Sequence, residues 1–385
     1  MRRPLIVTGA IVFVDTMFFT ALTPLLPHYV NELNLGKAGA GVLQAMYPLG
    51  ALVAGIPSGM AVARFGVKRT VLIGLTLLAA TTIGFGLANS AWALDLARFL
   101  QGVSSAFSWT GSLAWLVASA PARSRGRLIG SAFGVAIAGA LFGPVLGAVA
   151  FYTGTAAAFG TVGGLAVGLV VLAATTPAAT PQERQPVSML VHALRHNRTI
   201  QTGVWLCLVP ALLFGTLSVL APLRLSDLGW GAAAVGATYF VSAAFEAGWA
   251  PILGRLSDRY GRMPPLLAAL LASALVCLLL PLPHNPWVLA FLVVSAGFAF
   301  GSFWTPAMSL VTDAAEQTGL DYGYAFALVN IAWAPGQAGG SAIGGALASA
   351  TTDAVPYVAL AAICLLTLAA LLRYRDTAVP VTADR

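Results

Sequence analysis

Three ionisable side chains stand well inside long apolar runs of the sequence: Asp15, Arg98 and Glu246. An ionisable group within a membrane helix costs roughly 2.5–3.5 kcal/mol on insertion scales, so it tends to face a cavity and a partner. Asp15 lies about ten residues into its run, which places it near the middle of a bilayer. A buried carboxylate with a cation nearby can gain and lose a proton as its surroundings change. Asp15 is therefore a candidate proton carrier.

Glu246 lies towards the end of its apolar run and is the buried acid of the second half of the chain. Two functional interpretations stay open at this point. The carboxylate attracts a cationic substrate, or it carries a second proton. The structural alternative is a carboxyl group that is hydrogen-bonded between helices.

Polar residues at helical spacing form stripes that point to a binding surface. One stripe holds Arg98, Gln101, Ser105, Ser108 and Ser112, the second holds Ser302, Thr305, Ser309 and Thr312, and the third includes Asn330, Trp333 and Gln337. Aromatic side chains nearby can stack on a flat or cationic ligand. We name as candidates Phe19, Tyr47, Trp109, Tyr239 and Trp304, although any single aromatic residue is more often part of a core or a lipid-facing surface.

The composition identifies the elements that must position these residues. Of the 385 residues, 58% are hydrophobic and 9% are charged, and the mean hydropathy is +0.86. Soluble domains carry roughly 25% charged residues, so soluble, disordered and disulfide-framework classes are excluded. A membrane helix needs about 20 apolar residues. Twelve such runs are present, at 5–27, 39–62, 70–88, 94–119, 128–152, 156–175, 200–223, 232–253, 264–282, 286–311, 323–348 and 355–372.

The basic residues predict the orientation of these spans. Most of the 20 Lys and Arg residues fall in alternate connections and at the two ends of the chain. Positive residues mark the cytoplasmic side, so both termini are predicted to be cytoplasmic, in the inner (plasma) membrane. This pattern argues against a nucleic-acid partner despite the net charge of +7. The connection at 313–321 departs from it because it is acidic.

A longer polar connection divides the spans into two sets. The predicted organisation is a six-helix bundle at 1–175, a cytoplasmic linker at 176–199 and a second six-helix bundle at 200–385. The second part of the linker is either an amphipathic helix, with Leu190 and Leu194 facing lipid, or a simple tether.

An internal repeat supports this division. Gly59, Arg64, Gly66 and Arg69 lie between spans two and three, and the spacing of Gly59, Arg64 and Gly66 recurs between spans eight and nine. The second copy contains Gly254, Asp258, Arg259, Gly261 and Arg262, and the offset of 195 residues suggests a duplicated six-helix unit. At this offset Asp15 corresponds to Pro210 and Arg98 to Val293.

The repeated loop resembles the signature of the major facilitator superfamily. Arg98, Gln101 and Gly102 are similar to its Arg-x-x-Gln-Gly motif. The glycines and proline of span five are similar to the Gly-Pro motif of proton-coupled exporters, with Ala148 in place of the last glycine. The first span resembles that of the twelve-helix drug:proton antiporters and of the vesicular amine transporters.

This resemblance implies an all-α membrane protein with 12 transmembrane helices, arranged as two six-helix bundles around a central cavity. It implies that Asp15 and Arg98 act together in proton coupling; the alternative is a static salt bridge. It also assigns conformational-switch roles to Gly59, Arg64, Gly66, Arg69, Gly254, Asp258, Arg259, Gly261 and Arg262, and to a bend facing the other half at Gly139, Gly143, Pro144 and Gly147. Ala63 departs from the family pattern, which has Asp there.

The function expected from these features is proton-coupled export of small amphipathic or cationic compounds by alternating access. The expected substrate-binding residues are Glu246, Gln101, Ser105, Ser108, Trp109, Tyr239, Trp304, Thr305, Asn330 and Trp333. One alternative is an exporter of a metabolite such as a sugar or an amino-acid derivative, and another is a membrane sensor that does not transport. No enzyme activity, cofactor or metal is expected, the partners are substrate, protons and the lipid bilayer, and the chain is expected to be monomeric.

Overall fold

The computed structural model describes residues 2–119, 125–178, 186–320 and 322–377, so Asp321 of the acidic connection lies outside the described residues. The described part of the chain is helical throughout and contains no strand. Its helices are α1 (Arg2–Leu33), α2 (Gly36–Phe65), α3 (Val67–Leu87), α4 (Ala91–Ala118), α5 (Arg125–Thr153), α6 (Thr155–Thr175), α7 (Val187–His196), α8 (Arg198–Asp227), α9 (Ala232–Tyr260), α10 (Met263–Leu279), α11 (Pro286–Gly301), α12 (Trp304–Gln317), α13 (Tyr322–Ala350) and α14 (Ala354–Thr377).

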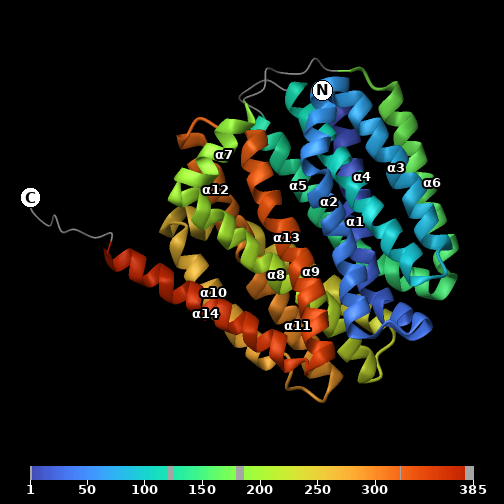
Figure 1. Cartoon of the computed structure of the whole chain (residues 1–385), viewed down its shortest axis with the longest axis vertical. Coiled ribbons are helices and arrows are strands. Elements are labelled where there is room, and N and C mark those ends of the chain that lie inside the picture. The colour runs from blue at the N-terminus through green and yellow to red at the C-terminus, as the bar shows by residue number, and fades with distance from the viewer. Residues whose placement is uncertain (1, 120–124, 179–185, 321, 378–385) are drawn as a thin grey trace, which may run out of the picture.

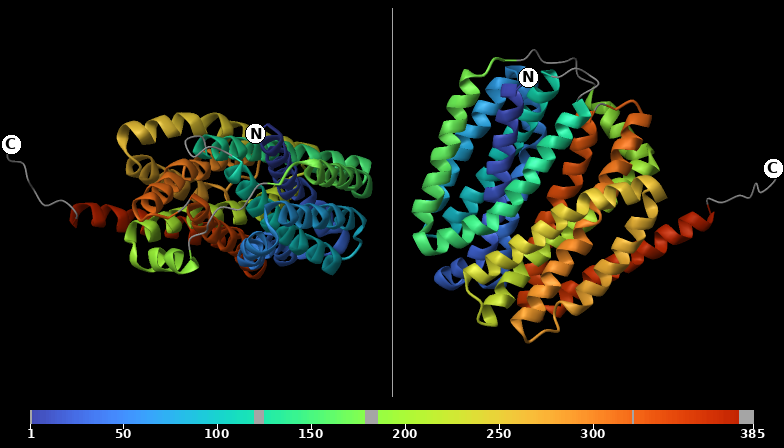
Figure 2. Two further views of the ribbon diagram at one scale, coloured as in Figure 1. Left: turned by 90° about the horizontal axis from the view of Figure 1, so that it is seen from above. Right: turned by 180° about the vertical axis from the view of Figure 1, so that it is seen from behind.

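The long helices pack into two groups that follow each other along the chain (Figure 1). In the N-terminal group, α1 packs on α5, α4 packs on α2 and α3, and α3 packs on α6. In the C-terminal group, α8 packs on α13, α9 on α11, and α10 on α14. Figure 2 shows the two groups inclined to each other, with α14 extending away from the rest of the C-terminal group.

Eight stretches of helix are long and apolar enough to cross a membrane, by length and composition alone. They include α1, α2, α3, α6, α8, most of α5 and of α14, and the combined length of α11 and α12, while α10 is a shorter apolar helix. Every run predicted as a span is largely helical. The remaining helices α4, α9 and α13 carry more of the polar residues that line the interior.

The two groups meet mainly through α2 on α13 and α5 on α9. We call the end of the molecule where α2 meets α3 and α9 meets α10 the basic end, and the other end the opposite end. At the opposite end, an ion pair joins Lys37 of α2 to Asp353 in the connection between α13 and α14. Close by, a Cβ on Gly41 would lie 3.2 Å from the Cα of Gly345, so the backbones of α2 and α13 approach closely.

The tenth predicted span, 286–311, is broken in two. Helix α11 ends at Gly301 and α12 begins at Trp304. Pro306 has no N–H, so the carbonyl of Ser302 cannot make its helical hydrogen bond to that residue. The break therefore falls one turn before the proline, as expected for a kink of this cause.

The repeated connections form equivalent turns. Gly66 separates α2 from α3 with φ 81° and ψ 164°, and Gly261 follows α9 with φ 88° and ψ 166°. Side-chain-bearing residues rarely adopt this conformation. The two positions are 195 residues apart, so the sequence repeat corresponds to a repeated backbone geometry.

The connection between the two groups contains the amphipathic helix α7, but its apolar face is covered by protein. Leu190 and Ala193 are buried in the core, and Leu194 packs against it. The prediction that Leu190 and Leu194 face lipid is wrong, because α7 packs its apolar face against α8 and the neighbouring core.

Candidate functional site

Asp15 lies at the centre of a buried hydrogen-bond network in the N-terminal group. Its side chain is 1% exposed. One carboxylate oxygen, Oδ2, accepts hydrogen bonds from the Tyr47 hydroxyl (2.7 Å), the Ser105 hydroxyl (2.7 Å) and the Trp109 indole N–H (2.8 Å). The other oxygen, Oδ1, is buried without a hydrogen-bond partner among the described residues. The carboxyl group is thus held firmly at one oxygen and left unpaired at the other.

Arg98 is fully buried beside this network but does not form an ion pair with Asp15 within the described part of the chain. Its guanidinium donates to the Phe19 carbonyl (3.2 Å) and to the Gln101 side chain (3.4 Å). Its Cζ lies 5.1 Å from the centre of the Tyr47 ring. The predicted pair is therefore indirect, because the Tyr47 side chain contacts both groups.

Two residues of the predicted stripe on α4 are covered by α3. Gln101 is fully buried and donates to the Thr81 carbonyl of α3 at 3.3 Å. Ser108 is also fully buried, and a Cβ on Gly74 of α3 would lie 2.5 Å from its hydroxyl oxygen. The expectation that Gln101 and Ser108 bind substrate is corrected, because α3 covers this side of α4. Ser105 faces Asp15 instead.

The glycines of α5 face α1, the helix that carries Asp15. A Cβ on any of Gly139, Gly143 or Gly147 would overlap atoms of α1, namely those of Phe13, Met17, Thr20, Ala21 and Pro24. The predicted orientation of this motif towards the other half is wrong for the glycines. Pro144 does face the other half, since a Cβ on Gly236 of α9 would lie 2.8 Å from its carbonyl oxygen.

Trp109 extends the Asp15 network to α5. Its indole N–H binds the carboxylate, and its ring packs edge-on against Phe133 of α5 with the centroids 5.6 Å apart. The network therefore connects α1, α2, α4 and α5. Two of these helices, α2 and α5, make the main contacts with the C-terminal group.

Glu246 occupies a different setting, beside the break between α11 and α12. Its side chain is half-buried, and a Cβ on Gly301 would lie 2.6 Å from its Cγ atom. No hydrogen bond or ion pair to its carboxylate is found among the described residues. One turn along α9, Trp249 donates its indole N–H to the Ser302 hydroxyl at 3.0 Å. The break in the tenth span is therefore packed against the same face of α9.

The other predicted substrate-binding residues are spread over the C-terminal group. Tyr239 donates its hydroxyl to the Leu217 carbonyl at 2.9 Å, Trp304 and Thr305 are half-buried at the start of α12, and Asn330 is exposed on α13. Trp333, one turn from Asn330, packs edge-on against Phe19 of α1 with the ring centroids 5.7 Å apart. Phe19 and Trp333 thus bring the two groups together next to Tyr47.

The predicted switch loops at the basic end form contacts within each group. Arg262 pairs with Asp258 and, at 3.2 Å, with Asp313 of α12. The hydrogen bond that Arg262 donates to Asp258, reinforced by Asp313, raises the pKa of Arg262 above its ordinary value. Asp313, in the acidic connection, thus pairs within its own group.

The first loop has no equivalent ion pair in the described residues, since Ala63 stands at the position of Asp258. Arg64 stacks on Phe65 at 5.6 Å and Arg259 on Tyr260 at 5.3 Å, so this part of the repeat is shared. Arg69 is exposed, and a Cβ on Gly254 would only touch Thr305, at 3.7 Å.

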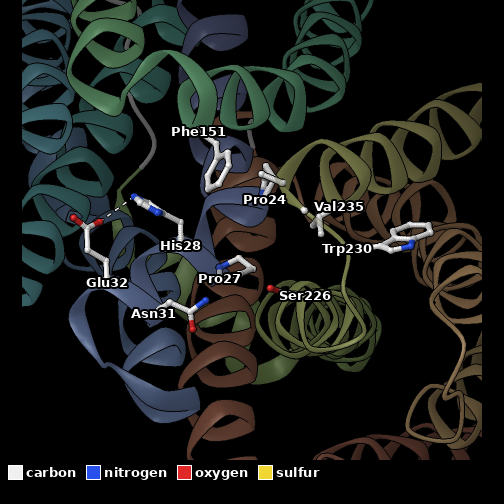
Figure 3. A pocket seen from close by; sticks show the side chains of 11 residues that line it. Pro24, Pro27, His28, Asn31, Glu32, Phe151, Ser226, Trp230 and Val235 are labelled. Carbon is white, nitrogen blue, oxygen red and sulfur yellow. Dashed lines mark ion pairs between the residues drawn. The ribbon is translucent and has the colours of Figure 1, made fainter.

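A cavity of about 470 Å³ lies between the two groups at the opposite end (Figure 3). None of the residues predicted from the sequence lines it. Its wall comes from α1, α5, α8, α9 and the turn before α9, with Pro24, Pro27, His28, Asn31, Glu32, Phe151, Ser226, Trp230, Gly231, Ala232 and Val235. His28 and Glu32 form an ion pair of 2.9 Å on one wall.

Sequence reasoning missed the role of Tyr47. It was only one of several candidate stacking aromatics, yet it donates to Asp15, lies 2.8 Å from the Ser105 hydroxyl, and stacks on Phe19 at 4.7 Å. A tyrosine hydroxyl needs a partner when it is buried in an apolar helix. The sequence therefore indicated that the Tyr47 hydroxyl needs a partner. The spacing of residues along α2 could not identify the helix that supplies this partner.

Comparison with known protein families matches residues 8–336 and 211–384 to the Major Facilitator Superfamily. The chain is 26% identical over 278 residues, 72% of both chains, to an uncharacterized MFS-type transporter of Enterobacter sp. (strain 638). It is 26% identical over 263 residues, 68% of both chains, to the uncharacterized MFS-type transporter YcaD of Escherichia coli O139:H28 (strain E24377A / ETEC).

Three solved structures share the fold at low sequence identity. A bacterial homolog of the human lysosomal transporter Spinster, inward-facing and occupied, has a TM-score of 0.80 at 16% identity over 96% of both chains. The xylose transporter XylE from E. coli, partially occluded and inward open, has a TM-score of 0.76 at 15% identity, covering 100% of this chain and 98% of that one. The nucleoside transporter NupG has a TM-score of 0.75 at 13% identity, covering 96% and 99%.

Proposed function

The chain belongs to the Major Facilitator Superfamily, a family of membrane transporters, and on this premise we propose that it exports small amphipathic or cationic compounds in exchange for protons. It is an integral membrane protein with the all-helical fold of that family. The proposed mode of transport is alternating access, in which two helical bundles rock around a central site. The charge distribution favours an inner-membrane location with both termini in the cytoplasm.

The buried carboxyl group of Asp15 carries this proposal. A buried charge without an ion pair is unfavourable in a medium of low dielectric, and binding a proton removes that charge. Three donors converge on Oδ2, while Oδ1 is unpaired and can accept a proton. The protonated and ionised forms of Asp15 therefore accept hydrogen bonds of different strength from Tyr47 and Trp109.

This difference in hydrogen bonding affects helices that form the contacts between the two groups. Tyr47 belongs to α2, which packs on α13, and Trp109 contacts α5, which packs on α9. Protonation of Asp15 weakens the hydrogen bonds at its oxygen, since donors bind a charged acceptor more strongly than a neutral one. A proton on Asp15 thereby changes the packing of α2 on α13 and of α5 on α9. Coupled transport requires such a connection between proton binding and the arrangement of the two groups.

The preference for cationic substrates rests on Glu246 and on the aromatic side chains between the groups. The Glu246 carboxylate is half-buried and has no partner among the described residues, so a ligand cation would satisfy it. The rings of Phe19 and Trp333 meet at the boundary of the two groups. Aromatic faces attract organic cations.

The test is transport in proteoliposomes with an acidic lumen and the membrane potential clamped. We expect the wild type to accumulate ethidium, a flat aromatic cation, against its gradient, and Asp15→Asn to lose this accumulation while remaining folded. Asp95→Asn, which changes a half-buried acid of α4, is the matched control and should retain transport. Undiminished accumulation by Asp15→Asn would show that the proton is carried elsewhere.

A second candidate is export of a polar, uncharged metabolite, and Asn330 favours it. Its exposed amide lies one turn from the ring of Trp333, and an amide beside an aromatic ring suits a sugar or a nucleoside. Two of the structural neighbours transport a sugar and nucleosides. Accumulation of labelled xylose or uridine but not ethidium would favour this candidate. Binding of a ligand without accumulation would favour a sensor.

A further inference from the structure

The helix α7 in the connection between the two groups carries two histidines four residues apart. His192 and His196 lie on the same face of this helix, because residues i and i+4 are neighbours. Their imidazole rings are stacked, with the centroids 4.3 Å apart and the ring planes inclined by 22°, so the exposed His192 ring must turn out of the stack before both rings can point a nitrogen at one ion. Both side chains are exposed. Two imidazoles at this spacing on one helical face are the arrangement that zinc-binding helices use.

The hydrogen bonding of His196 prepares it for metal binding. Its Nδ1 lies 3.0 Å from the backbone carbonyl of His192. A carbonyl only accepts, so this contact requires a proton on Nδ1 and leaves the lone pair of a neutral ring on Nε2. Metal-ligating histidines almost always donate their other ring N–H to such an acceptor, which fixes the tautomer and the ring orientation.

The two rings also face a concave surface. A cavity of about 560 Å³ lies between α7 and the turn after α12, and both histidines line it. The other lining residues, several of which carry oxygen atoms, are Ser188, Met189, Ala193, Asn197, Thr318 and Leu320. An ion held by the two imidazoles would therefore be partly enclosed, with room for water in its remaining positions.

We propose that His192 and His196 form a binding site for a divalent transition-metal ion of the Zn²⁺ class. Neutral imidazole suits Zn²⁺, Cu²⁺ and Ni²⁺ and discriminates against Ca²⁺ and Mg²⁺, which prefer oxygen ligands. The described residues contain no group of three His, Cys, Asp or Glu side chains that could hold a metal. The site therefore has two protein ligands and open positions, unlike the closed four-ligand sites that stabilise folds.

A metal at this site would act on the connection between the two groups. Chelation by His192 and His196 spans one helical turn and holds α7 in its helical form. Asn197 follows directly and caps α8, accepting a hydrogen bond from the Ile200 N–H at 3.1 Å. The ion would thus stiffen the segment that leads into α8, and it would do so independently of the transported substrate.

The test is a calorimetric titration of the full chain with ZnCl₂, using protein purified in detergent without a polyhistidine tag. We expect one binding event that weakens at least about tenfold in His192→Asn and in His196→Asn, since even the loss of an outer-shell partner costs roughly that much. The chain has 4 histidines, so His284→Asn and His28→Asn are matched controls that should bind as the wild type does. His28 is the stringent control, because it lies near Glu32 at the same i, i+4 spacing.

Hydrogen–deuterium exchange supplies a second readout that does not depend on transport. Zn²⁺ should slow exchange of the amides of α7 in the wild type and leave them unchanged in His192→Asn. Zn²⁺ binding that survives both α7 substitutions, or that is lost in His28→Asn alone, would overturn the proposal. Binding without any slowing of exchange in α7 would also overturn it.

Discussion

Asp15 and Glu246 are both carboxyl groups on long apolar helices, but the two halves of the chain hold them differently. Asp15 is 1% exposed, and three donors from α2 and α4 bind a single one of its oxygens. Glu246 is half-buried beside the break in the tenth span, and no donor to it is found among the described residues. A fully buried arginine accompanies the first carboxyl, whereas Val293 stands at the corresponding position of the second half.

The contrast suggests that the two halves have different roles, although they share a duplicated six-helix unit. A carboxyl enclosed by its own protein donors can exchange a proton but has little room for a substrate. A carboxyl that has no protein partner can pair with a ligand. Because it lies next to an interrupted helix, it can also move together with the bound ligand.

The buried Arg98 of the N-terminal group should matter far more to stability than the partly exposed Arg262 of the C-terminal group. Arg98→Leu leaves the Phe19 carbonyl and the Gln101 side chain without their donor, and each buried acceptor left unpaired costs about 1–3 kcal/mol. Arg262→Gln breaks exposed ion pairs, which are worth about 0–1 kcal/mol each. Thermal unfolding in detergent would compare the two variants. Equal midpoints would contradict the view that only the N-terminal group depends on a buried charge.

Glycine substitutions should show that the hydrogen-bond network around Asp15 is more rigid than the surroundings of Glu246. A Cβ on Gly102 would overlap the Tyr47 carbonyl and lie 2.8 Å from the Ala51 nitrogen, both backbone atoms. We expect Gly102→Ala to destabilise the protein by about 1–3 kcal/mol, as overpacking does.

The matched variant is Gly301→Ala, for which the three atoms nearest to the new Cβ all belong to the flexible side chain of Glu246. That side chain can rotate away, so we expect a smaller loss of stability, below about 1 kcal/mol. Thermal unfolding measures both variants. A larger loss for Gly301→Ala would show that Glu246 is held as tightly as Asp15.

Removing the charge of Glu246 should change substrate preference rather than coupling. Glu246→Gln is expected to weaken binding of ethidium about tenfold, or about 1.4 kcal/mol, because the half-buried carboxylate loses its attraction for a cation. Binding of chloramphenicol, which is uncharged, should change little. Fluorescence and calorimetric titrations would measure the two affinities. Equal losses for both compounds would mean that Glu246 has a structural role.

The smallest expected effect concerns the loops at the basic end. Asp258 pairs with Arg262, whereas Ala63 leaves the first loop without that contact. Ala63→Asp adds an acid that can form contacts across the basic end only when that end is closed, and exposed pairs contribute about 0–1 kcal/mol. We expect a modest shift towards closure of that end. Distances between spin labels on α2 and α9 would detect it, and an unchanged distribution would contradict the prediction.

The helical elements and the internal repeat could be located from the amino-acid sequence. A membrane span needs about 20 apolar residues, so the runs predicted as helices could be located from composition alone, and the family comparison confirms the all-helical fold. The repeat that contains Gly66 and Gly261 was also readable, and in the structure both glycines adopt a backbone conformation that residues with a side chain rarely take. The cost of a charge in an apolar run singled out Asp15, Arg98 and Glu246.

The neighbours that each face of a helix contacts depend on how the helices pack, and the sequence does not give them. Helical spacing shows that Gln101 and Ser108 share a face with Arg98, but it cannot say that α3 covers them. The same limit applies to Gly139, which could approach either α1 or the other half, and to Leu190, which could face lipid or core. Tyr47 lies 32 residues from Asp15 in sequence, and nothing local pairs them. Periodicity fixes which residues lie side by side on one helix, whereas the partner of a buried polar group is set by the packing of separate helices.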